Sequence, residues 1–130
     1  MLISYLDEGE DARETLRVVQ DAGHKAIAVA GDISEEAHCQ QLVQRAVQEF
    51  GKLDILVNNA AFQRTYQSIT EISAEELQYT FATNIFALFY LCKAAAPHLK
   101  EGATIINTSS VEAFQPEPSL LAYAATRPPS

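Results

Sequence analysis

Short apolar runs recur along the chain, and each of them turns polar at its end. Three stand out: KAIAVAGD at 25–32, LDILVNNA at 53–60 and ATIINTSS at 103–110. Each contains three to five apolar residues without regular polar alternation, which is typical of strands buried on both faces of a parallel sheet. A fourth run, MLISYL at 1–6, indicates a further strand or the end of one.

Amphipathic helical patterns separate these runs. Apolar residues recur three and four positions apart over 8–22, 34–51 and 74–96, as expected for helices that bury one face. Ser34 is the predicted N-cap of the second helix. The sequence SAEE, which begins at Ser73, is a capping box and predicts the start of the third helix.

The resulting order is β-α-β-α-β-α-β, with no linker and no boundary between domains. Such alternation predicts right-handed crossovers and a doubly wound parallel α/β sheet. Ligands bind these sheets outside the carboxyl ends of the strands. The polar residues that close the runs therefore predict a ligand site at one edge of the sheet: Asp32, Asn58, Asn59, Ser109 and Ser110.

The composition argues against some classes of binding partner for this domain. The 130 residues are 48% hydrophobic and carry a formal net charge of -8, which argues against nucleic acid and anionic membrane surfaces as ligands. Solubility alone also explains the acidity. No apolar stretch is long enough for a bilayer, and the first residues do not form a signal peptide. Cys39 and Cys92 fall on separate helices, so we expect free thiols and a cytoplasmic setting.

A metal site is not expected. The three histidines, His24, His38 and His98, show no ligand spacing and are interpreted as surface residues.

Five motifs carry a resemblance to a known family. GDIS, LDILVNNAA, TNIF, IINTSS and YAATR, in this order and spacing, resemble the short-chain dehydrogenases/reductases from about Met1 to Arg127. Within the family, the chain is most similar to the bacterial glucose or general-stress-type branch. The resemblance implies a Rossmann-like NAD(P)-binding domain. It also implies hydride transfer between the nicotinamide and a small alcohol or carbonyl substrate.

The resemblance assigns cofactor contacts to four residues after the apolar runs. Asp32, with Ile33, matches the position that contacts the adenine, where a carboxylate accepts a hydrogen bond from the exocyclic amine. The alternative is that Asp32 only serves the start of the following helix. Asn59 and Ala60 match the segment beside the cofactor, in which Ala61 replaces the family's glycine.

The resemblance also implies a catalytic set. Ser110 precedes Tyr123 by thirteen residues, the family's spacing between the serine that orients the substrate oxygen and the tyrosine that exchanges its proton. Asn84 matches the asparagine that holds a water in the proton relay. The alternative for Asn84 is a satisfied polar residue at a helix kink.

The end of the chain departs from the family. Free tyrosine titrates near pH 10, and the family assists it with a lysine one turn later, where this chain has Arg127 in the cofactor-binding position. Pro128 and Pro129 disfavour helix past residue 126. We therefore do not expect Tyr123 and Arg127 to meet as the family pair does.

The five glycines do not form the family's G-x-x-x-G-x-G turn. We therefore expect 1–130 to be a single partial domain that lacks the first βα unit and the C-terminal helices and strands. Apolar surface should then be uncovered, and the chain alone should be inactive.

Two further questions stay open at the level of sequence. The acidic stretch YLDEGED weakly favours NAD over NADP, although a solvated helix start explains it equally well. The helix 74–96 is aromatic on more than one face. It could make the chain a homo-oligomer, or a non-catalytic interaction module that binds nucleotide weakly.

Overall fold

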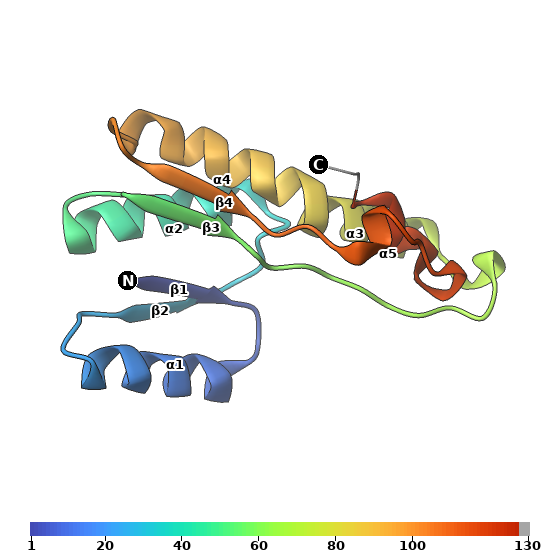
Figure 1. The fold of residues 1–130 in the computed structure, drawn as a ribbon, viewed down its shortest axis with the longest axis horizontal. Coiled ribbons are helices and arrows are strands. Elements are labelled where there is room, and N and C mark those ends of the chain that lie inside the picture. The colour runs from blue at the N-terminus through green and yellow to red at the C-terminus, as the bar shows by residue number, and fades with distance from the viewer. Residues whose placement is uncertain (128–130) are drawn as a thin grey trace.

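The computed structural model describes residues 1–127, and Figure 1 shows strands and helices alternating along them. The strands are β1 (Leu2–Tyr5), β2 (Ile27–Ala30), β3 (Ile55–Asn58) and β4 (Thr104–Asn107). The helices are α1 (Gly9–Asp21), α2 (Glu36–Phe50), α3 (Ala74–Phe81), α4 (Ala87–Ala95) and α5 (Leu121–Ala125). Each predicted strand is present and shorter than its apolar run.

The strands form two separate parallel pairs rather than one sheet. β1 pairs with β2, and β3 pairs with β4. In a doubly wound sheet of order 3-2-1-4-5-6, a further strand lies between these two pairs. The fold is therefore the predicted Rossmann-like α/β arrangement in its predicted incomplete form, with the central position between β1 and β3 left without a strand from residues 1–127.

The ends of the helices follow local side-chain chemistry. The Ser73 hydroxyl accepts a hydrogen bond from the Glu76 backbone N–H at 3.1 Å, as the capping box predicts. Gly51 ends α2 with a φ of 74°, a left-handed conformation that glycine adopts without strain. The prediction that Ser34 is the N-cap of α2 is wrong. The N-cap of α2 is Glu35, because the Asp32 carboxylate already accepts the Ser34 backbone N–H and holds the preceding turn.

The third predicted helix, 74–96, is interrupted. A π-helical segment, Ala82–Phe86, lies between α3 and α4, and a 3-10 turn, Ala96–His98, follows α4. π-segments inside α-helices are rare and occur frequently at functional sites. Asn84 lies in this segment, so the helix irregularity that its position suggested is real.

The core lies where α2 packs against α4. Cys39, Leu42 and Ala87 are buried there. Burial, with the nearby Glu36 and Asp32 carboxylates, raises the pKa of the Cys39 thiol to about 11, and both cysteines are free. On the opposite face of β3 and β4, apolar side chains remain exposed, as expected for a partial domain: Ile55, Val57 and Ile106.

Residues 1–127 contain no helix that is both long and apolar enough to cross a bilayer. The same residues contain no group of three potential metal ligands. The interpretation of His38 as a surface residue is wrong. It is half-buried, and an atom added at the Cβ position of Gly31 would lie 2.1 Å from its ring.

Candidate active site

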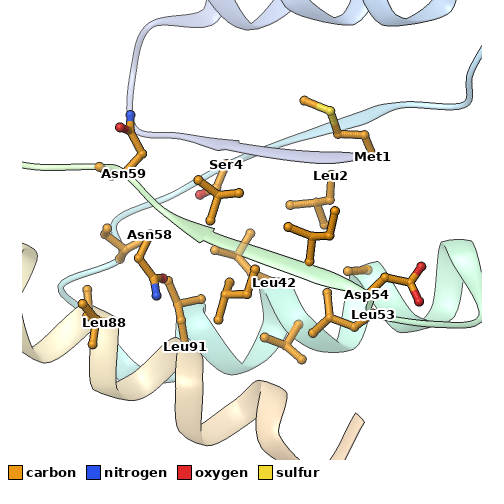
Figure 2. Close-up of a pocket in the computed structure, with 18 of the residues that line it drawn as sticks. Met1, Leu2, Ser4, Leu42, Leu53, Asp54, Asn58, Asn59, Leu88 and Leu91 are labelled. Carbon is orange, nitrogen blue, oxygen red and sulfur yellow. The ribbon is translucent and has the colours of Figure 1, made fainter. Parts of the chain in front are cut away.

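A cavity of about 770 Å³ lies between β1 and β3 and extends past the carboxyl end of β3. Figure 2 shows Asn58 and Asn59 at this end and Asp54 at the opposite end of the strand. Six of the predicted site residues line the cavity: Ile33, Asn58, Asn59, Ala60, Asn84 and Arg127. The topology thus brings together residues that are far apart in the sequence.

Asn84 ties three segments together. Its Oδ1 accepts the Phe62 backbone N–H at 2.7 Å. Its Nδ2 donates to the Phe62 carbonyl at 2.8 Å and to the Thr126 Oγ1 at 2.9 Å. Both amide protons are therefore used inside the protein, and only the second lone pair of Oδ1 is left for a water.

Tyr123 and Arg127 are in contact, through the face of the tyrosine ring. α5 ends at Ala125, as predicted, and Pro128 and Pro129 lie outside the described residues. The Arg127 side chain nevertheless turns back, with its guanidinium carbon 5.1 Å from the centre of the Tyr123 ring. This is a cation–π geometry.

Thr108 joins the ends of β3 and β4 to the C-terminal segment. Its hydroxyl donates to the Asn59 Oδ1 at 2.9 Å, and its carbonyl accepts from Arg127 Nη1 at 2.9 Å. The sequence analysis missed both Thr108 and Thr126 as site residues. The available signal was the position of Thr108 in the polar close of the 103–110 run, beside the two serines.

Asp32 serves the turn before α2, as the alternative to a cofactor contact expects. Its Oδ1 accepts the Ser34 backbone N–H at 2.8 Å. It does not line the cavity. Tyr79 of α3 lies close enough to be affected by its charge: burial, and after it the negative charge of Asp32, raises the pKa of Tyr79. Ile33 lines the cavity, and its carbonyl accepts from the Cys39 thiol at 3.2 Å.

Ser110 caps the 3-10 turn Val111–Ala113, and its Oγ accepts the Glu112 backbone N–H at 3.3 Å. This turn packs against α5, which carries Tyr123. Because Ser110 only accepts in this contact, its hydroxyl proton is available to an external oxygen. Ser110 and Tyr123 lie on neighbouring elements and do not line the cavity.

The fold and the residues at this edge define a class of protein, and comparison with known proteins agrees. Residues 1–128 match the family model of the short chain dehydrogenases. The chain belongs to this family.

Two curated relatives come from Bacillus subtilis. An uncharacterized oxidoreductase, YhdF, is 48% identical over 96% of this chain and 43% of its own length. General stress protein 39 is 46% identical over 96% of this chain and 44% of its own length. The chain therefore spans less than half the length of these relatives.

Among solved structures, a short chain dehydrogenase from Burkholderia cenocepacia in complex with NADP is 31% identical, with a TM-score of 0.91. The match covers 97% of this chain and 51% of that one. The two strand pairs therefore belong to the same fold as a protein about twice as long.

Proposed function

We propose that these residues form part of the site of an NAD(P)-dependent oxidoreductase that acts on a small alcohol or carbonyl compound. The observation that supports this proposal most directly is the cavity at the carboxyl end of β3, where Asn59, Asn84 and Arg127 converge. The family membership and the NADP complex of a relative point the same way.

The residues present fit a nicotinamide dinucleotide. The Arg127 Nε is buried and has no hydrogen-bond partner among residues 1–127, so it offers a donor to an acceptor on a bound molecule. Asp32 uses Oδ1 for the Ser34 N–H, and its second carboxylate oxygen could accept from the adenine amine. Asn59 and Ala60 would lie along the cofactor.

In the proposed reaction the nicotinamide supplies or accepts the hydride. The Ser110 hydroxyl orients the substrate oxygen through its unused proton. The Tyr123 phenol gives its proton to that oxygen in reduction and takes one in oxidation. The Arg127 guanidinium places positive charge against the Tyr123 ring, and Asn84 holds α5 through Thr126 and keeps one lone pair for a relay water.

We further propose that the 130-residue chain alone does not catalyse the reaction. We also propose that it binds NAD in preference to NADP. The Glu8 carboxylate accepts the backbone N–H groups of Leu6 and Asp7, each at 3.2 Å. Negative charge is thus held just after β1, where it would repel a 2′-phosphate.

Free Cys39 and Cys92 support a reducing, cytoplasmic setting.

The test is titration of the chain with NADH, followed by nicotinamide fluorescence. We expect saturable binding that Asp32→Asn and Asn59→Ala each weaken about tenfold, the value of one hydrogen bond to a charged or buried partner. NADPH should bind more weakly than NADH, and Glu8→Gln should reduce the difference.

Asp54→Asn is the matched control, because Asp54 lines the same cavity at the amino end of β3. It should leave NADH affinity unchanged. Equal effects of Asp32→Asn and Asp54→Asn, or no effect of Asn59→Ala, would contradict the proposed site. Turnover of aldehydes by the 130-residue chain would contradict its proposed inactivity.

A second proposed property is self-association through the helical stretch 74–96, at the start of α4. Phe86 is 47% exposed and Phe89 is 65% exposed, and the two lie about one turn apart. Aromatic side chains contribute strongly to interfaces because each buries a large apolar area. The chain would then act as an interaction module whether or not it binds cofactor.

Sedimentation velocity checks this property. The unmodified chain should sediment as a dimer or larger species, and Phe89→Ser should shift it to the monomer. Phe114→Ser, which removes an equally exposed aromatic ring outside α4, should sediment like the unmodified chain. If the unmodified chain sediments as a monomer, the proposed self-association is wrong.

A further inference from the structure

Two successive pairs of polar side chains join the carboxyl ends of β3 and β4. Asn58 is opposite Asn107 in the strand register, and its Nδ2 donates to the Asn107 Oδ1 at 2.9 Å and to the Cys92 Sγ of α4 at 3.7 Å. One position later, the Thr108 hydroxyl donates to the Asn59 Oδ1 at 2.9 Å. Because side chains alternate between the two faces of a strand, this second pair points away from α4.

The backbone of Thr108 is held on two sides. Its N–H donates to the Asn58 carbonyl at 3.0 Å, which continues the β3–β4 ladder past the end of the strands. Its carbonyl accepts from the Arg127 Nη1 at 2.9 Å. A β-branched side chain has few rotamers on such a backbone. The Thr108 hydroxyl is therefore a fixed donor, whereas the Asn59 amide rotates about its own side-chain bonds.

This contact decides which atom Asn59 offers to a ligand. An amide side chain has one oxygen that accepts and one nitrogen with two protons to donate. A rotation that presented Oδ1 to a ligand would break the bond from Thr108, so Nδ2 is the atom left for the ligand. Asn59 lines the cavity, and Figure 2 shows it at the carboxyl end of β3.

Arg127 is a second donor anchored to the same residue. Its Nη1 is held by the Thr108 carbonyl, and the whole side chain is buried, with the residue 9% exposed. Its Nε is buried without a hydrogen-bond partner among residues 1–127, and Arg127 lines the same cavity as Asn59. Since a guanidinium only donates, both side chains that Thr108 holds require an acceptor from the ligand.

We propose that Thr108 is a positioning residue for the bound dinucleotide, and that its hydroxyl orients Asn59 so that Nδ2 donates to a ligand oxygen. Thr108 has this role only if the proposed function holds, because the role needs a nicotinamide dinucleotide at this end of β3. Thr108 itself does not line the cavity, so it acts through Asn59 and does not touch the ligand.

A pair of variants at Thr108 tests the role of the hydroxyl. Thr108→Val removes the hydroxyl but keeps the branched shape and the carbonyl that holds Arg127. In titrations with NADH followed by nicotinamide fluorescence, Thr108→Val should weaken binding about fivefold, as expected for the loss of one hydrogen bond. Thr108→Ser keeps the hydroxyl and should bind within about twofold of the unmodified chain.

Two comparisons separate orientation of Asn59 from general damage. In an Asn59→Ala background, Thr108→Val should cause no further loss, because the hydroxyl acts only through the Asn59 amide. Asn59→Asp keeps an acceptor for Thr108 but has no proton for the ligand, so it should bind NADH more weakly than Asn59→Ala. Thr104→Val, the same chemical change at the amino end of β4, should leave the affinity unchanged.

NMR relaxation of the Asn59 side-chain amide measures its orientation without a ligand. The order parameter of Nδ2 should fall in Thr108→Val and be retained in Thr108→Ser, because a freed amide moves faster and more widely. The resonance is identified by its loss in Asn59→Ala. An unchanged order parameter in Thr108→Val overturns the positioning role, whatever the affinities are.

The affinities distinguish failure of this role from failure of the proposed function. If NADH binds equally to Thr108→Val and to the unmodified chain, Thr108 is not a positioning residue, and the proposed function stands. A loss that persists in the Asn59→Ala background, or an Asn59→Asp variant that binds as tightly as Asn59→Ala, also overturns the role. If the unmodified chain does not bind NADH, the proposed function is wrong and the role of Thr108 fails with it.

Discussion

Asn84→Ala is expected to lower the free energy of unfolding by about 3 kcal/mol, since removal of a buried hydrogen-bonding partner costs roughly 1–3 kcal/mol for each group left unpaired. The Asn84 side chain is 4% exposed and serves both the N–H and the carbonyl of Phe62. Its third bond, to Thr126, holds the end of α5. Urea denaturation measures the change.

Thr80→Val is the matched control on the same helix. Thr80 is 1% exposed, but its hydroxyl bonds the Glu76 carbonyl of its own helix at 2.8 Å and ties no second segment. We expect a loss below about 1 kcal/mol. If Asn84→Ala costs no more than Thr80→Val, Asn84 does not hold the three segments together.

Gly31→Ala is the second change for which we expect a large effect, also about 3 kcal/mol, since overpacking and backbone strain each cost roughly 1–3 kcal/mol. Gly31 has a φ of 154°, and its added methyl carbon would lie 2.1 Å from the His38 ring. The affected turn connects β2 to Asp32. The measurement is again urea denaturation.

A double-mutant cycle separates the two causes of this loss. In a His38→Ala background the steric clash disappears, so Gly31→Ala should cost about half as much. Gly102→Ala provides the backbone term alone, because Gly102 has a φ of 89° and open space around it. An unchanged cost in the His38→Ala background would show that the ring is not the obstacle.

The apolar runs were sufficient to predict the four strands and their parallel pairing, because continuous apolar residues require burial on both faces. The π-segment at 82–86 could not be predicted in the same way. One widened turn leaves the apolar spacing of the 74–96 helix almost unchanged, and only the polar Asn84 at a buried position indicated an irregularity.

The contact between Tyr123 and Arg127 shows a different limit. Proline constrains the backbone before it, and α5 does end where that constraint predicts. The long arginine side chain is free of this backbone constraint. It donates to the Thr108 carbonyl and places its guanidinium over the Tyr123 ring. Thr108 was missed because the polar end of the 103–110 run does not distinguish the threonine from the two serines that follow it.

The start of α2 illustrates competition between two local signals. Ser34 has the side chain of an N-cap, but its own N–H is held by Asp32, and the Glu35 N–H is held by the Asp32 carbonyl. The turn that these bonds form delays the helix. Asp32 therefore has a structural task in the free chain, and its proposed contact with adenine would use the carboxylate oxygen that this task leaves available.

The burial pattern makes stability uneven along the chain. Of the buried apolar residues within 1–127, only Ala12 and Ala26 belong to the β1-α1-β2 unit, whereas α2 and α4 hold Cys39, Leu42 and Ala87. Units with few buried contacts open at lower free energy than the rest of a protein. The Asp32 side of the site adjoins the weaker unit, so its apparent affinity for any ligand is reduced by the fraction of molecules in which that unit is open.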